Sequence, residues 1–199
     1  MTLLDTTQPT IALQHLVSLY DLMKRANDYE NAQKILDLYE KLEHQKFVIS
    51  FTGHFSAGKS SMINALLGEE ILPKSPIPTS ANIVEIMSGD GSAKVHFIDQ
   101  GPKNYQAPYD IELIKDFCKD KQTVKKIELS TTEKILPDSC ILVDTPGIDA
   151  ADDADRVMTE SSLHLVDRLF YVMDYNHVQS EINLLFLKQI QDKEIPFYI

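Results

Sequence analysis

Hydrophobic residues recur at helical spacing over the first part of the chain, from Thr10 to Gln45. A break at "ANDYEN" divides this stretch into two amphipathic runs. Their apolar positions are Leu13, Leu16, Tyr20 and Met23, then Ala32, Ile35, Leu36, Tyr39 and Leu42. A spacing of three and four residues lines one face of a helix, so two helices are predicted. They form either a hairpin packed on the following domain or half of a helical bundle whose other helices come from elsewhere in the sequence.

From Phe47 onward, short apolar strands alternate with helical patterns. The predicted strands are 47–52, 82–88, 94–99, 124–130, 140–144, 168–173 and 195–199, and the predicted helices are 59–67, 110–119, 152–166 and 180–193. The Gly- and Pro-containing segment 99–110 is predicted to be a connecting loop. This alternation predicts an α/β domain with a mostly parallel central sheet covered by helices on both faces. Residues 1–46 are therefore expected to form a helical unit, and residues 47–199 an α/β domain.

The junction between the first strand and the next helix carries the sequence "GHFSAGKS", from Gly53 to Ser60. It matches GxxxxGK(S/T), the phosphate-binding loop, in which glycines let backbone N–H groups curl around an anion. The helix N-terminus adds its dipole and unpaired N–H groups to the same anion. Lys59 would bind phosphate oxygens, and the Ser60 hydroxyl would coordinate Mg²⁺. The predicted nucleotide contacts here are Gly53, His54, Phe55, Ser56, Ala57, Gly58, Lys59, Ser60 and Ser61.

A second phosphate-site motif follows the apolar strand in "CILVDTPG", residues 140–147. Asp144 stands at the strand's carboxyl end, where it can hold Mg²⁺ through water, and the Gly147 N–H can meet the γ-phosphate. Asp-x-x-Gly alone also makes ordinary turns. Its position after a buried strand and downstream of the phosphate loop gives it significance. Together the two motifs predict the three-layer fold of P-loop NTPases.

Between these motifs lies the proline-rich segment "LPKSPIPTSANIVEI", residues 72–86. Thr79 and Ser80 stand just before a predicted strand, where a hydroxyl could close on Mg²⁺ and sense the γ-phosphate. The pattern leaves open which of the two acts. Both are therefore predicted metal and catalytic positions.

Other polar clusters have simpler interpretations. The acidic residues Asp149, Asp152, Asp153 and Asp155 are interpreted as a solvated segment with a helix cap, in preference to a metal site. His164 and His177 lack metal-ligand spacing and are interpreted as structural or surface residues.

Composition narrows the class of protein. The 199 residues carry a formal charge of −11, which argues against non-specific nucleic-acid binding. Two widely separated cysteines, Cys118 and Cys140, are expected to be reduced core thiols in the cytoplasm. The N-terminus lacks the features of a signal peptide, and no apolar run reaches the roughly 18 to 20 residues that cross a bilayer.

"GHFSAGKSS", "LPKSPIPTSANIVEI" and "ILVDTPGIDAADD" together resemble the nucleotide motifs of the dynamin superfamily, particularly bacterial dynamin-like proteins. The resemblance covers about residues 47 to 199, and the N-terminal helices resemble the family's neck bundle. It implies a large GTPase that dimerises across its nucleotide faces and remodels, tethers or fuses membranes from the cytoplasmic side. It also implies GTP or GDP with Mg²⁺, and a monovalent cation, K⁺ or Na⁺, placed by Ser56.

The sequence departs from this family in two places. Phe55 stands where the family often has a polar residue, so His54 or a backbone carbonyl becomes the candidate for orienting the attacking water. No (N/T)KxD guanine-reading motif appears, and the last predicted strand, "EIPFYI", ends the chain. The chain is therefore expected to be part of a longer GTPase that binds lipid through other regions. A non-hydrolysing nucleotide-dependent scaffold and a ribosome-assembly GTPase are the alternative functions.

Overall fold

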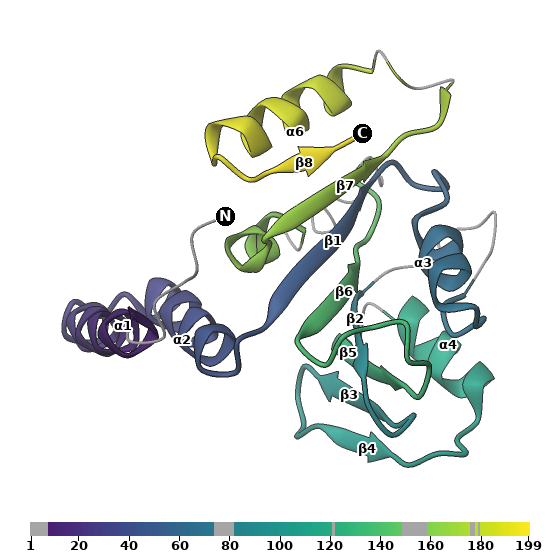
Figure 1. Cartoon of the computed structure of the whole chain (residues 1–199), viewed down its shortest axis with the longest axis horizontal. Helices are drawn as coiled ribbons and strands as arrows, with labels where there is room; N and C mark the ends of the chain where they lie inside the picture. Colours follow the sequence, from purple (N-terminus) through teal and green to yellow (C-terminus); the bar gives the residue numbers. More distant parts are fainter. Residues whose placement is uncertain (1–7, 74–81, 121, 149–158, 176–177, 179) are drawn as a thin grey trace. The chain divides into compact units, whose positions relative to one another are not determined.

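The computed structural model describes residues 8–73, 82–120, 122–148, 159–175, 178 and 180–199 (Figure 1). The chain divides into two units, Met1–Phe47 and Val48–Ile199. The first consists of two helices, and the second contains almost all of the sheet.

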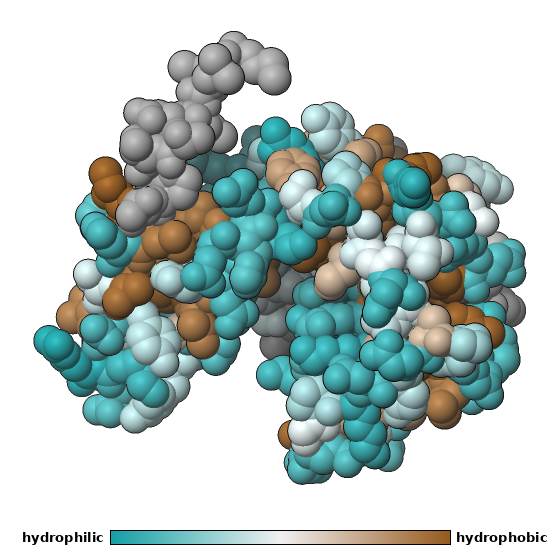
Figure 2. Space-filling view, turned by 60° about the horizontal axis from the view of Figure 1, so that its bottom comes forward, coloured by the Kyte–Doolittle hydropathy of each residue, from teal (hydrophilic) through white to brown (hydrophobic). Residues whose placement is uncertain are grey.

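In the first unit, helices α1 (Gln8–Arg25) and α2 (Tyr29–Glu43) pack against each other. Asp28 caps α2, because its carboxylate accepts a hydrogen bond from the Asn31 N–H at 3.1 Å. The two predicted helices are confirmed. Several apolar side chains of α1 stay exposed, namely Ile11, Val17, Leu19 and Leu22. At the left of Figure 2, hydrophobic residues (brown) gather over this helical pair.

The second unit is built on an eight-stranded sheet with the order β4-β3-β5-β2-β6-β1-β7-β8. The strands are β1 (Phe47–Gly53), β2 (Ile83–Ser88), β3 (Ala93–Phe97), β4 (Lys103–Tyr105), β5 (Val124–Thr131), β6 (Cys140–Asp144), β7 (Arg168–Val172) and β8 (Phe197–Tyr198). Strands β1, β7 and β8 run parallel to one another, and β2 runs parallel to β5. The antiparallel pairs, β2–β6, β3–β5 and β3–β4, all lie between β6 and the β4 edge.

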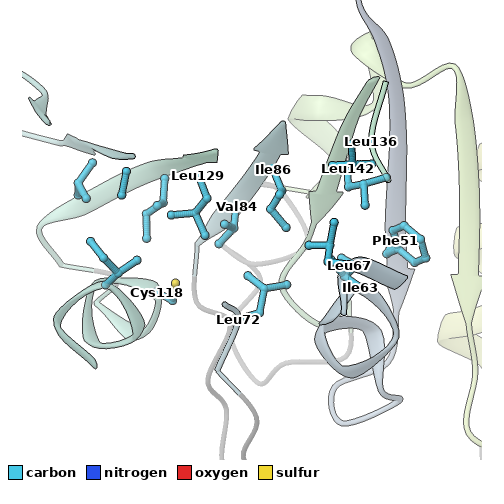
Figure 3. Close-up of a cluster of buried hydrophobic side chains, with 14 of the residues drawn as sticks. Phe51, Ile63, Leu67, Leu72, Val84, Ile86, Cys118, Leu129, Leu136 and Leu142 are labelled. Carbon is cyan, nitrogen blue, oxygen red and sulfur yellow. The ribbon is translucent and has the colours of Figure 1, made fainter. Parts of the chain in front are cut away.

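Helices cover both faces of the sheet. On one face, α3 (Lys59–Leu67) and α4 (Ile111–Lys119) pack on the larger core (Figure 3). On the other, α6 (Glu181–Asp192) packs on a smaller core. Adjacent residues of β7 point to opposite faces of the sheet. Val172 belongs to the larger core, and Tyr171 belongs to the smaller core together with Phe186 of α6. The predicted three-layer α/β fold is confirmed.

Segment 99–110, predicted to be a loop, contains β4, so that prediction was wrong. Three residues of β4 pair antiparallel with β3, from Ala93↔Tyr105 to Val95↔Lys103. A strand this short cannot show the alternation by which a sequence reveals a strand. Much of the predicted helix 152–166 lies outside the described residues. Within the described part, residues 159–162 are helical and Leu163–Leu165 form a 3-10 helix.

Both cysteines are buried and unbridged, as expected. Burial, with a further contribution from the charge of Asp144, raises the pKa of the Cys118 thiol to about 12, so the thiol stays protonated at neutral pH. Among the helices that the structure describes, none combines the length and the apolar character needed to cross a bilayer.

Candidate functional site

The predicted phosphate loop connects the end of β1 to the start of α3. Gly53 has a φ of 147°, and a Cβ there would stand 2.0 Å from the Val172 carbonyl oxygen. Gly58 has a φ of 98° and directly precedes the first residue of α3. Residues with a Cβ atom rarely adopt such positive φ angles, so both positions favour glycine. The structure therefore gives a local reason for the first and last glycines of the motif.

Lys59 is folded back over this loop. Its side chain is only 6% exposed, and Nζ donates to the carbonyl oxygens of His54 at 2.7 Å and Gly53 at 3.2 Å. A buried ammonium needs such acceptors, because removing it from water is costly. These carbonyls hold the lysine beside the loop that is predicted to receive phosphate.

The Ser60 hydroxyl donates a hydrogen bond of 2.6 Å to a carboxylate oxygen of Asp144. Ser60 stands in the first turn of α3, and Asp144 is the buried last residue of β6, so two separate motifs meet here. A hydroxyl and a carboxylate are the hard oxygen donors that Mg²⁺ prefers. The two side chains therefore suit an Mg²⁺ site. Among the residues described, no cluster of three or more His, Cys, Asp and Glu side chains offers another metal site.

The turn after Asp144 packs directly against the phosphate loop. A Cβ on Gly147 would lie 2.7 Å from the backbone nitrogen of Phe55, so only glycine fits without displacement. The buried Thr145 hydroxyl donates to the Phe51 carbonyl at 3.0 Å, and the Ile148 N–H donates to the Gly53 carbonyl at 3.2 Å. These contacts attach the turn to β1 on either side of Gly147.

The remaining predicted loop residues differ in exposure. Ser56 is exposed and has a φ of 61°, whereas Phe55 and Ala57 are partly buried. Ser61 faces outward on α3. His54 is 4% exposed, and its Nε2 lies 3.0 Å from Ser180 Oγ.

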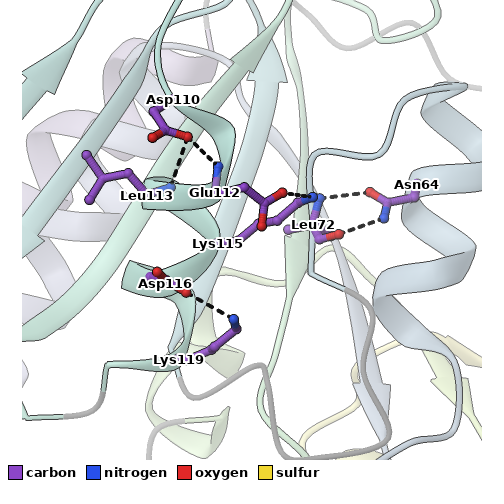
Figure 4. Close-up of polar contacts among 8 residues, drawn as sticks. All are labelled: Asn64, Leu72, Asp110, Glu112, Leu113, Lys115, Asp116 and Lys119. Carbon is purple, nitrogen blue, oxygen red and sulfur yellow. Dashed lines mark hydrogen bonds and ion pairs between the residues drawn. The ribbon is translucent and has the colours of Figure 1, made fainter.

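Thr79 and Ser80 lie outside the described residues, but buried asparagines are found on both sides of their segment. Asn64 of α3 makes paired hydrogen bonds with the backbone of Leu72, donating to its carbonyl at 2.9 Å and accepting from its N–H at 3.0 Å (Figure 4). Asn82 donates to the carbonyls of Phe117 and Asp120 at 2.9 Å and 2.8 Å. Asn64 therefore fixes the backbone of Leu72 before this segment, and Asn82, which follows it, is held against the carboxyl end of α4.

Sequence reasoning missed Asn64, Asn82 and Thr145 as site-supporting residues. A polar residue in a short helix or before a strand has no pattern that distinguishes a buried clamp from a surface position. The place of Thr145 inside the DxxG motif, directly after Asp144, was the one available signal. The acidic residues Asp149, Asp152, Asp153 and Asp155 and also His177 lie outside the described residues. His164 Nδ1 lies 2.9 Å from the Ser161 carbonyl, a local backbone contact.

Comparison with known proteins gives a family match. Residues 49–199 match the Dynamin family. The chain is 39% identical over 174 residues to Dynamin-like protein A of Bacillus subtilis, which covers 87% of this chain and 15% of that protein. It is 28% identical over 194 residues to Dynamin-like protein 1 of Campylobacter jejuni, covering 77% of this chain and 26% of that protein. The chain thus spans about a quarter or less of these relatives.

A solved structure shares the fold. It belongs to an oligomerised bacterial dynamin pair described as providing a mechanism for long-range sensing and tethering of membranes. Its TM-score is 0.59 at 21% identity, and the likeness covers 95% of this chain and 37% of that chain.

Proposed function

Because the chain belongs to the dynamin family, we propose that it forms the phosphate-binding part of a GTP-hydrolysing dynamin-like protein. The observation that carries this proposal is the meeting of the two motifs, with Ser60 Oγ 2.6 Å from a carboxylate oxygen of Asp144 and the buried Lys59 at the start of α3. The preference for guanine rests on family membership.

The loop residues would bind the phosphates largely through backbone N–H groups and Lys59. Phosphate oxygens would replace the carbonyls of Gly53 and His54 as partners of the lysine Nζ. Ser60 and Asp144 would hold Mg²⁺, which when bound neutralises charge on the phosphates. Gly147 lies against Phe55, so its backbone would follow changes at the loop, and its N–H would meet the γ-phosphate. Thr79 or Ser80 would complete the metal site, and exposed Ser56 would help to place a K⁺ or Na⁺ ion.

A second copy of the protein is proposed to dimerise across this nucleotide face. The surface supports this proposal, because the amino-terminal half of α6 exposes three apolar side chains and its capping residue, Ser180, bonds to His54 of the loop. These side chains are Ile182, Leu184 and Leu185. Exposed apolar groups that lie close together are typical of protein contacts.

The first unit is proposed to belong to a longer helical bundle that transmits nucleotide state to membrane-bound regions. The exposed Ile11, Val17 and Leu22 of α1 support this proposal, since an amphipathic helix normally buries its apolar face. The protein would act as a cytoplasmic protein at the inner face of the cell membrane. Tethering, remodelling and fusion are the candidate outcomes.

Phosphate release tests the proposal. The intact protein should release phosphate from GTP in the presence of Mg²⁺, with activity per molecule rising as protein concentration rises. Constant activity per molecule would contradict dimer-assisted hydrolysis. Nucleotide binding without phosphate release would instead support the non-hydrolysing scaffold, which the apolar side chain of Phe55 favours.

A further inference from the structure

A partly buried hydrogen bond joins the phosphate loop to the helix on the other side of the sheet. His54 belongs to the loop before α3, while Ser180 is the N-cap of α6. His54 Nε2 lies 3.0 Å from Ser180 Oγ, and the same oxygen accepts from the Asn183 N–H at 3.3 Å. A hydroxyl can accept one hydrogen bond and donate another, so Ser180 serves the helix and the loop together.

The backbone of His54 is already engaged by the residue that is proposed to bind phosphate. Its carbonyl accepts from Lys59 Nζ at 2.7 Å and from the Ala57 N–H at 3.3 Å. If phosphate takes over the ammonium, this carbonyl loses its charged donor. The peptide at residue 54 must then adjust, and the buried imidazole attached to it must adjust too, because the 4% exposed side chain has little space of its own.

Beyond its cap, α6 is firmly attached to the domain. Asn183 is fully buried and accepts a hydrogen bond from the Tyr171 hydroxyl of β7. Phe186 and Ile190 belong to the smaller core. Because the rest of the helix is held in this way, a shift at Ser180 would act mainly on the start of α6, and the amino-terminal half of this helix carries the exposed Ile182, Leu184 and Leu185.

From these contacts we propose that His54 is a positioning residue that couples phosphate binding at the loop to the first turn of α6 through Ser180. The inference rests on the proposed function, because the coupling needs phosphate to engage Lys59. It assigns His54 a task other than contact with the nucleotide. Coupling through one bond is reciprocal, so Ser180 must also influence nucleotide affinity.

Amide hydrogen exchange in α6 measures this coupling in the intact protein. Exchange of Glu181–Asp192 is compared with and without a non-hydrolysable GTP analogue and Mg²⁺, in the wild type, Ser180→Ala and Ser180→Thr. The nucleotide-induced change in the amide exchange rate of the first turn should be about fivefold smaller in Ser180→Ala than in the wild type. This factor corresponds to roughly 1 kcal/mol. Ser180→Thr keeps the hydroxyl and should retain the wild-type response.

Asp110→Ala provides the matched control for loss of a cap. Asp110 caps α4 by accepting from the N–H groups of Glu112 at 3.0 Å and Leu113 at 3.5 Å. Among the described residues, its hydrogen bonds join it to α4 and not to the phosphate loop. This variant should lose similar stability yet keep both the α6 response and the nucleotide dissociation constant. The dissociation constant of Ser180→Ala should shift by about the same factor as its exchange response.

Three results would overturn the inference. They are an α6 response that is absent in the wild type, a response of wild-type size in Ser180→Ala, and equal behaviour of Ser180→Ala and Asp110→Ala. Failure of the proposed function itself looks different, because the wild type would then not bind the nucleotide analogue at all.

Discussion

Replacing Asn64 with alanine should destabilise the α/β domain strongly. The Asn64 amide satisfies both the N–H and the C=O of Leu72, at 3.0 Å and 2.9 Å, in a fully buried setting. Alanine leaves both backbone groups without these partners, and each unsatisfied buried group costs about 1–3 kcal/mol. The better helix propensity of alanine offsets roughly 0.5 kcal/mol. The expected loss in the free energy of unfolding is therefore about 2–5 kcal/mol.

Urea unfolding followed by circular dichroism measures this loss, and Asn31→Ala is the control. Asn31 is also a helical asparagine with an amide hydrogen bond, to Asp28 at 2.8 Å, but this bond is exposed. Its replacement should change the free energy of unfolding by about 0.5 kcal/mol or less. If Asn64→Ala and Asn31→Ala lose equal stability, the Asn64 amide is not what fixes Leu72, and the reasoning fails.

Two further predictions concern the site and the sheet. Gly147→Ala should weaken nucleotide binding by about tenfold or more in a fluorescence titration, because the new Cβ would stand 2.7 Å from the Phe55 nitrogen. Gly101→Ala, whose Cβ would meet nothing within 4 Å, is its control, and equal affinities would contradict the packing argument. Burial acts to raise the pKa of the Glu128 carboxyl, but its ion pair and hydrogen bond with Lys126 outweigh burial, so the pKa is lowered. A carboxylate whose pKa is lowered by folding stabilises the fold while it is ionised, so the stability deficit of Glu128→Gln should be present at neutral pH and shrink from about pH 5 to 3; a constant deficit in urea titrations would refute this.

Local patterns predicted most of the described helices and strands, and the glycine-containing loop between β1 and α3. The reason is that the loop's requirements are local: glycine where φ is positive, and a lysine at the start of the helix. Predicted helix 180–193 is observed as Glu181–Asp192 with Ser180 as its cap. The direction of β2 against β6 could not be predicted, because periodicity says nothing of which strands pair or how.

The supporting contacts of the site depend on long-range packing and escaped prediction for that reason. The amide of Asn64 reaches Leu72 only because the chain leaving α3 folds back beside it. Ser180 meets His54 only because the ends of β1 and β7 are neighbours in the sheet. The spacing of residues along the chain does not reveal contacts that form only when distant elements pack together.

Nucleotide binding by Lys59→Ala tests the central claim most directly. The control is Lys119→Ala, which removes an exposed ammonium paired with Asp116 at 3.0 Å. In the presence of Mg²⁺, the intact wild-type protein and the Lys119→Ala variant should bind a non-hydrolysable GTP analogue with equal affinity. Lys59→Ala should bind about 100-fold more weakly, because it loses the charged donor to phosphate. Equal affinity of Lys59→Ala and the wild type would contradict the assignment of this loop as the phosphate site.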